Sequence, residues 1–370
     1  MANFDLTNLA VKMLCPNNHV QVDNSGYPSV LVYIPAFRLS DVLVEDLAVE
    51  GYDRVHPAFI VNGQQIPGFY YSKYQNVVNN GRAYSLPGED PAVSRSFTDA
   101  VNLCSSKGHG WHLSTNAEWA AIALWCRKNG FQPYGHNAVG RDYRENINKA
   151  IPTLYDDLGG AKRVATGTGP LTWSHDNSVS GIWDMNGNVW EWQGGVRIMW
   201  GELQIIANND AADPNNPQNA TSTCWKAIRA SDGALVEPEN SEKVKLLSGA
   251  TLRLDFVDSV WKFTTTITSS EDNARNCSFS KVTCTAEVSD AAKMLLRALA
   301  LLPEAYDENY DGDNVWWNNY GLDRCLFRGG CSQAYNNQAG VFSMIAHNSR
   351  ESTPITCGFR CAYIPEIPEA

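Results

Sequence analysis

The chain has 370 residues, 44% of them hydrophobic and 19% charged, and 29 Lys and Arg against 40 Asp and Glu give it a net charge of −11. This apolar content is sufficient for a folded core, and the length allows one large domain or two domains of roughly 100–200 residues each. The excess of acidic residues argues against nucleic acid as a partner, because Lys and Arg supply the affinity for a phosphate backbone.

The predicted elements of the first third of the chain are short. Residues 1–30 are predicted to be a polar N-terminal segment with two turns, followed by a strand over 30–34 that Pro35 ends. Thr98 and Asp99 are expected to cap a short helix through residue 104. Ser114 with Glu118 resembles a capping box, and residues 119–126 are apolar nearly all round, which predicts a buried helix.

The second half of the chain is predicted to combine exposed strands with one more helix. Residues 208–222 indicate a polar loop, and apolar and polar residues alternate in three later segments, which predicts strands over 252–256, 260–267 and 277–284. Ser289 and Asp290 are expected to begin a helix that continues to Leu302, where Pro303 ends it.

The absence of recognisable targeting signals and the pattern of cysteines bear on where the protein is made. The N-terminal residues contain no basic segment followed by an apolar one, and no apolar run reaches the length of a membrane-spanning helix, so we expect no signal peptide and no membrane insertion. We expect synthesis in the cytoplasm, with a virion-associated or a cell-surface location both left open. Ten cysteines without a Cys-x-x-Cys pair disfavour a structural zinc site, and mostly reduced thiols are favoured.

Four groups of residues resemble the formylglycine-generating enzyme and sulfatase-modifying-factor superfamily. They are VYIPAF at 32–37, PAVSRSFTDA at 91–100 with WHLSTNAEW at 111–119, GIWDMNGNVWEW at 181–192, and FRGG at 327–330 with GFRCA at 358–362. The resemblance implies an α+β, C-type-lectin-like fold with two main helices, small mixed sheets and much irregular loop. It places the domain at 31–370, with one large insertion at about 196–308, and Trp183, Trp190 and Trp192 in the core.

The same comparison argues against the family's enzymatic activity. The family's enzymes oxidise a substrate thiol with two cysteines that follow Arg-Gly-Gly, and the alignment places Ala334 and Ala339 at those positions, with Cys331 three residues too early. A methyl group cannot act as a thiolate nucleophile or a copper ligand. Seven scattered histidines also lack the His-rich pattern of the iron-dependent branch. We expect no catalytic residue, and a formylglycine-generating-type thiol oxidase with relocated cysteines is the alternative.

Residues 315–363 are similar to the variable proteins of diversity-generating retroelements. The similarity rests on VWWNNYGLDRCLFRGG at 315–330, AGVF at 339–342 and GFRCAY at 358–363. In that family a template rich in asparagine codons is copied with errors at adenine, and the lectin fold displays the altered residues. The resemblance implies a non-catalytic, hypervariable ligand-binding protein, a receptor or adhesion protein of phage or prophage origin. Its ligand would be an unknown protein or glycan, on a cell surface.

The genetic code tests this resemblance position by position. Changes at the adenines of an asparagine codon cannot produce Trp, Met, Gln, Glu or Lys, and Met344 and Glu351 stand where the family template has no asparagine. Gln338 does not fit, so the register between 331 and 338 stays open. The residues predicted to bind the ligand are Asn318, Asn319, Tyr320, Ser332, Ala334, Tyr335, Ile345, His347, Asn348, Ser352, Pro354 and Thr356.

Strand periodicity predicts which of these residues face outward. Alternation over 343–349 directs Met344 and Ala346 toward the core and Ile345 with His347 toward solvent. An outward Ile beside His is typical of a contact surface. Trp316 and Trp317 have a codon without adenine, so we expect them to belong to the scaffold.

A calcium site is the one cofactor that the sequence suggests, and none is required. Asp307, Asn309, Asp311 and Asp313 match the first half of an EF-hand loop, but Asn318 stands where a bidentate Glu is expected, which favours a solvated acidic turn. The superfamily resemblance also implies calcium near Asn188 and Glu191 in family members. A calcium-dependent lectin is therefore a third functional possibility, although the Glu-Pro-Asn type of sugar motif is not found at either site.

Overall fold

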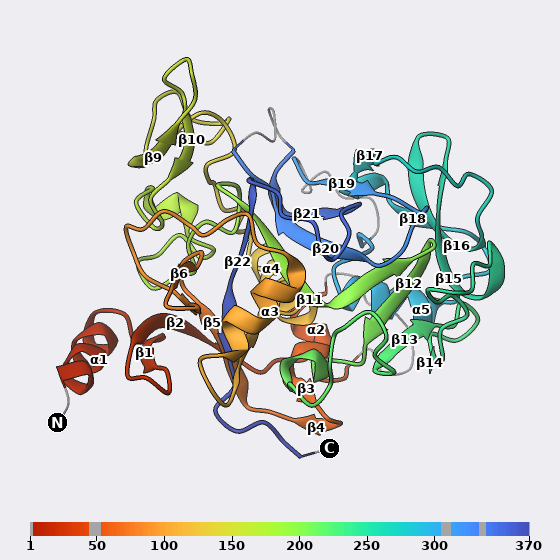
Figure 1. Ribbon diagram of the computed structural model, residues 1–370, viewed down its shortest axis with the longest axis horizontal. Coiled ribbons are helices and arrows are strands. Elements are labelled where there is room, and N and C mark those ends of the chain that lie inside the picture. The colour runs from red at the N-terminus through yellow and green to blue at the C-terminus, as the bar shows by residue number, and fades with distance from the viewer. Residues whose placement is uncertain (1–2, 44–52, 305–311, 333–337, 370) are drawn as a thin grey trace.

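The computed structural model describes residues 3–43, 53–304, 312–332 and 338–369, and the fold is α+β (Figure 1). Within these residues the helices are α1 (Asn3–Leu14), α2 (Leu39–Val42), α3 (Phe97–Ser105), α4 (Asn116–Lys128) and α5 (Asp290–Ala298), with 3-10 turns at Pro57–Phe59, Leu171–Trp173, Asp210–Ala212 and Phe279–Lys281. No helix in this described part combines the length and apolar character needed to cross a bilayer.

A twelve-stranded mixed sheet forms one half of the fold. In order along the sheet its strands are β17 (Arg275–Ser278), β19 (Asn314–Trp317), β21 (Gly340–Ala346), β20 (Arg324–Gly329), β11 (Trp190–Met199), β12 (Glu202–Ile206), β15 (Ser248–Val257), β16 (Val260–Thr266) and β18 (Thr283–Cys284). Beside this row, β13 (Trp225–Ile228) pairs with β12 and β14 (Leu235–Val236), and β22 (Cys357–Phe359) pairs with β11. The sheet is larger than expected because the strands of residues 196–308 extend it.

A five-stranded sheet forms the other half. Its order is β1 (Asn18–Val22), β2 (Pro28–Pro35), β5 (Gly68–Ser72), β23 (Cys361–Tyr363) and β8 (Trp111–Leu113). Three two-stranded hairpins complete the described structure, namely β3 (Ile60–Val61) with β4 (Gln64–Gln65), β6 (Val77–Asn79) with β7 (Arg82–Tyr84), and β9 (Pro152–Tyr155) with β10 (Ala161–Val164).

The helix ends differ from the predictions by a few residues. The N-cap of α3 is Ser96 rather than Thr98, and the N-cap of α4 is Thr115 rather than Ser114, each closing a capping box with the acidic residue three positions later. Helix α5 begins after Ser289 as expected, but it ends at Ala298 because Ala300 adopts a left-handed backbone, with φ of 49°. Helix α1 lies within the N-terminal segment, for which the sequence predicted two turns and no helix.

The strands of residues 248–284 are more buried than expected. Leu252, Leu254, Trp261 and Phe263 are at most 1% exposed, because one face of β15 and β16 packs on the main core. The segment 277–284 is not one strand, since a 3-10 turn at Phe279–Lys281 separates β17 from β18.

The strand β21 lies between the two largest apolar clusters of the core. Met344 and Ala346 lie in the larger cluster with α4, and Ile345 lies in the smaller cluster with Trp190, Trp192 and Phe327. Both faces of β21 are thus covered by apolar side chains, which bears directly on the predicted contact surface.

Candidate functional site

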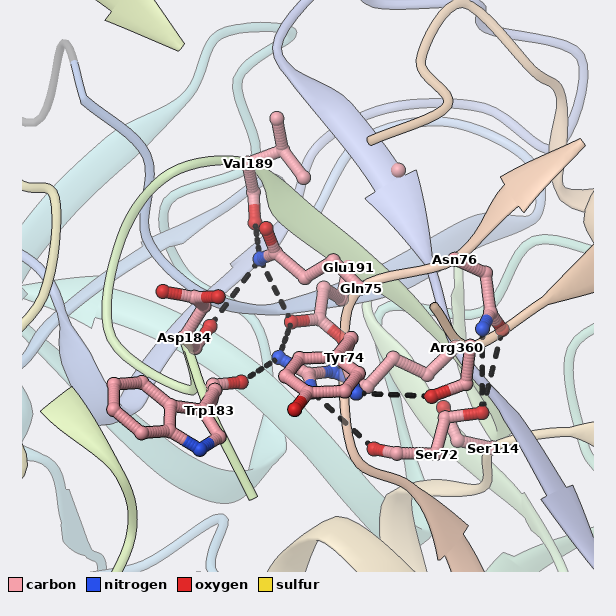
Figure 2. A network of polar contacts seen from close by, with 12 residues as sticks. Ser72, Tyr74, Gln75, Asn76, Ser114, Trp183, Asp184, Val189, Glu191 and Arg360 are labelled. Carbon is pink, nitrogen blue, oxygen red and sulfur yellow. Dashed lines mark hydrogen bonds and ion pairs between the residues drawn. The ribbon is translucent and has the colours of Figure 1, made fainter. Parts of the chain in front are cut away.

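The residues that carry the superfamily resemblance meet in the core as a buried ion pair. Glu191 on β11 accepts hydrogen bonds of 2.7 and 3.0 Å from Arg360, and both side chains are at most 1% exposed (Figure 2). Arg360 also donates to the carbonyls of Trp183 at 2.6 Å, Lys73 at 3.1 Å and Ser72 at 3.3 Å. These contacts satisfy the guanidinium within the protein, so this motif holds the scaffold together.

The arginine of the Arg-Gly-Gly element has the same kind of role. Arg328 is fully buried and donates to Asn116 Oδ1 at 2.8 and 3.0 Å, and to the carbonyls of Leu299 at 3.1 Å and Ala300 at 3.0 Å. It therefore ties β20 to the start of α4 and to the end of α5, where free carbonyls attract a cation. Burial lowers the pKa of Arg328 to about 9.

The positions where the superfamily's thiols would stand contain no reactive group in the described residues. Ala339 is 3% exposed and packs so closely on Gly330 that a Cβ on that glycine would lie 2.2 Å from the Ala339 Cβ. Cys331 and Cys357 are buried, and burial raises the pKa of the Cys357 thiol well above its usual range. Buried thiols with raised pKa values are poor nucleophiles. Ala334 lies outside the described residues, as does Tyr335.

Asn318 and Asn319, two of the predicted contact residues, are buried, which corrects the expectation that they face a ligand. Asn318 is 4% exposed and bonds to the Tyr320 amide and to Asp272, at 2.7 and 3.1 Å. Asn319 is fully buried and donates to the carbonyls of Leu254 and Ser269 at 2.9 and 2.8 Å. Both amides join β19 to residues of the 196–308 segment, a contact that the sequence pattern could not reveal.

The outward orientation predicted for Ile345 is also wrong. Ile345 is only 9% exposed, because β21 lies between β19 and β20 and Ile345 pairs with Trp316 and Phe327 on those strands. The alternation itself is confirmed, since Met344 and Ala346 lie on the opposite face in the main core. Period-2 alternation separates the two faces of a strand but does not say what covers each face.

The remaining predicted residues of the C-terminal region gather in the segment 347–356, here called the anchored loop. Its side chains at His347, Asn348, Ser352, Pro354 and Thr356 are half-buried, and Ile355 is 69% exposed. Backbone carbonyls attach the loop to the scaffold. Asn348 accepts from Cys325 N at 3.2 Å, Arg350 from Phe97 N at 3.0 Å, Pro354 from Ser94 N at 3.2 Å and Thr356 from Trp190 N at 2.9 Å. Burial lowers the pKa of His347 below its usual value.

Tyr320 belongs to a second exposed cluster that sequence reasoning missed. Its ring lies edge-on to Trp200, with centroids 5.6 Å apart, and Lys245 Nζ lies 3.9 Å from the Tyr320 centroid and 4.8 Å from that of Trp200. Tyr320 is 37% exposed. Trp200 and Lys245 come from the 196–308 segment, so this segment contributes aromatic and cationic groups beside the predicted contact residues.

A cavity of about 280 Å³ lies beside Ala339 and Gly340. Its lining includes Phe131, Arg144 and Asp313. Asp313 turns inward and accepts from Phe342 N at 2.9 Å and Ser343 Oγ at 3.3 Å, and burial raises its pKa to about 7. The other calcium candidates, Asp307, Asn309 and Asp311, lie outside the described residues. Among the residues that the structure describes, no group of three His, Cys, Asp or Glu side chains is placed to hold a metal.

Ser332, another of the predicted contact residues, is half-buried and donates through Oγ to the Lys162 carbonyl.

One stretch of the chain is similar to a known family. Residues 24–204 match the family model described as Sulfatase-modifying factor enzyme 1-like domain, which confirms the superfamily resemblance over that stretch. No curated protein matches the chain. Among solved structures, PvdO from Pseudomonas aeruginosa is 13% identical and covers 93% of this chain and 97% of its own, with a TM-score of 0.35. Treponema denticola variable protein 1 is 10% identical and covers 94% of this chain and 99% of its own, also with a TM-score of 0.35. The fold is α+β, and over residues 24–204 it is of the sulfatase-modifying-factor type.

Proposed function

Given a fold of the sulfatase-modifying-factor type, we propose that the chain is a non-catalytic, hypervariable ligand-binding protein and a target of retroelement-driven adenine mutagenesis. The observation that carries the proposal is the construction of the anchored loop. Its backbone links to the scaffold include the carbonyls of Asn348, Pro354 and Thr356, three positions whose residues are reachable from asparagine codons, beside the carbonyl of Arg350. A carbonyl bond persists when the side chain on the same residue changes. The loop can therefore present different side chains from one fixed backbone.

The scaffold beneath the loop is suited to this use because it also holds the loop through a side chain outside the predicted variable set. Arg350, within the loop, forms a buried pair with Asp323 at 2.6 Å, and Asp323 also binds Arg197 at 3.1 Å. Arginine at 350 stands outside the asparagine positions of the family template. A preordered backbone lowers the conformational entropy lost when a ligand binds.

The ligand-binding surface is proposed to combine the half-buried side chains of the anchored loop with the cluster of Tyr320, Trp200 and Lys245. Aromatic rings supply contact area at low entropic cost, and small polar residues supply adaptable hydrogen bonds, as in antibody paratopes. The ligand is proposed to be a protein or a glycan on a cell surface, with the protein itself carried on a virion or displayed on a cell. No cofactor takes part in this mode of binding.

The alternative function, a thiol oxidase of the formylglycine-generating type, is disfavoured by the burial of Cys331 and by Ala339. The experiment that separates the two functions is selection from a displayed library in which His347, Asn348, Ser352, Pro354 and Thr356 carry the residues reachable from asparagine codons. We expect folded binders to several unrelated cell-surface proteins or glycans. A library that yields no binders, together with thiol oxidation that is lost in Cys331→Ala, would favour the enzyme.

A further inference from the structure

Four oxygens surround one side-chain nitrogen in the core. Gln75 Nε2 lies 3.2 Å from the carbonyl oxygen of Asp184, 3.3 Å from that of Gly187, 3.1 Å from that of Val189 and 3.0 Å from Glu191 Oε1 (Figure 2). An amide nitrogen has only two hydrogens, so it cannot give each of four oxygens a hydrogen bond of its own. Several carbonyl oxygens and one carboxylate converging on a point is the arrangement that a hard cation takes. We call these four oxygens the oxygen cradle.

The orientation of the Gln75 amide is fixed from its other side. Gln75 Oε1 accepts a 2.9 Å hydrogen bond from Asn188 Nδ2, and Asn188 is itself held by the backbone of Val164 through bonds of 3.0 and 3.1 Å. Reversing the amide would direct its oxygen at four other oxygens and its NH₂ group at that of Asn188. Gln75 is fully buried, so water cannot compensate for such a loss.

The calcium that the superfamily resemblance implies near Asn188 and Glu191 does not fit this chain. Asn188 directs its side chain to Gln75 Oε1, and Glu191 directs one oxygen to Gln75 Nε2. The point between the ligands is filled by an amide. We infer that the Gln75 side chain takes the place of a cation in the oxygen cradle, so that residues 184–191 are held in their fold without a metal ion.

The charge of the cradle agrees with a neutral occupant. Glu191 Oε1 also accepts a 3.0 Å bond from Arg360, and Glu191 Oε2 accepts a 2.7 Å bond from the same guanidinium. The carboxylate that would otherwise attract a cation is already compensated by a buried positive charge. A neutral donor then supplies the hydrogen bonds that the carbonyls still need.

The consequence for the molecule concerns the predicted contact surface. The cradle leads directly into β11, whose first residue, Trp190, donates its amide to the Thr356 carbonyl of the anchored loop. If Gln75 holds the cradle, this connection keeps its geometry in the presence of a chelator. Binding by the anchored loop would then not depend on calcium, in contrast to a calcium-dependent lectin.

The test measures thermal unfolding of the full chain with calcium chloride, magnesium chloride or EDTA, for the wild type and the variants Gln75→Ala and Gln75→Glu. The wild-type Tm is expected to stay constant in all three. Both variants are expected to have a lower Tm that rises by several degrees with calcium in a saturable way, because the first exposes the cradle oxygens and the second adds a carboxylate.

Gln193→Ala is the matched control, because Gln193 is equally buried and bonds to Ser114 and to the Glu191 carbonyl. The Tm of Gln193→Ala is expected to be lower than that of the wild type and not to change when calcium is added. A variant that does not fold without metal is refolded with and without calcium, and the yield replaces the Tm. A wild-type Tm that changes with calcium or EDTA overturns the inference. It is overturned equally if calcium restores neither variant, or if calcium restores Gln193→Ala as well.

Discussion

Replacing Ile345 by asparagine distinguishes a buried position from an exposed one within the predicted variable region. Ile345 is 9% exposed and packs between Trp316 and Phe327 on the two neighbouring strands. Removing this side chain from apolar surroundings costs about 1.5–3 kcal/mol, and an amide buried without partners adds roughly 1–3 kcal/mol. We therefore expect Ile345→Asn to lower the free energy of unfolding by about 3–5 kcal/mol.

Thr356→Asn is the matched control, because Thr356 is half-buried and its backbone carbonyl, rather than its side chain, accepts the bond from Trp190. We expect this variant to lie within about 0.5 kcal/mol of the wild type. Urea denaturation followed by tryptophan fluorescence measures both values, and the slope of the transition shows whether the unfolding remains comparable. Equal losses in the two variants, or an Ile345→Asn protein as stable as the wild type, would refute the reasoning about β21.

Three further predictions concern the scaffold. Arg360→Met leaves Glu191 buried without its partner and is expected to lower the free energy of unfolding by about 3–5 kcal/mol in denaturant titrations. Arg163→Met removes a more exposed ion pair and is expected to lower it by at most about 1 kcal/mol. Similar losses in the two variants would contradict the structural role of the buried pair. Burial raises the pKa of Asp313 to about 7, so the folded state keeps a proton that the unfolded state loses near pH 4. The free energy of unfolding is therefore expected to fall by up to about 4 kcal/mol as pH rises from about 4 to about 7, and Asp313→Asn is expected to lack this decrease. An unchanged pH profile in the variant would show that Asp313 does not cause it. Cys331 is 5% exposed, so the native protein is expected to react with thiol reagents at this residue only after it unfolds. Rapid labelling of Cys331 in the native protein, measured by mass spectrometry, would favour the oxidase alternative.

The sequence predicted the elements whose causes are local. The strand over 30–34 and the helix after residue 115 follow from an apolar run and a capping box, and both are present as β2 and α4. The early end of α5 could not be predicted, because it depends on the left-handed backbone at Ala300 rather than on Pro303.

The candidate site was harder to predict because its environment comes from distant segments. Ile345 was assigned to the correct face of its strand, but Trp190 and Trp316 cover that face. The role of Gln75 depends on oxygens that lie 109 to 116 positions further along the chain. No pattern within the Tyr- and Asn-rich loop around Gln75 indicates them. The superfamily motifs were sufficient to predict the fold class, whereas the packing around each predicted contact residue could be seen only in the structure.

The measurement that tests the central claim most directly is deep sequencing of this gene across many descendants of one clonal host culture. We predict that substitutions accumulate at adenine-derived positions in the anchored loop, 347, 348, 352, 354 and 356, and that position 345 accepts mainly apolar residues because it is buried. Trp316, Met344 and Phe359 are predicted to stay constant. A C-terminal region as constant as the rest of the gene would contradict active diversification and with it the account of the anchored loop as a variable surface.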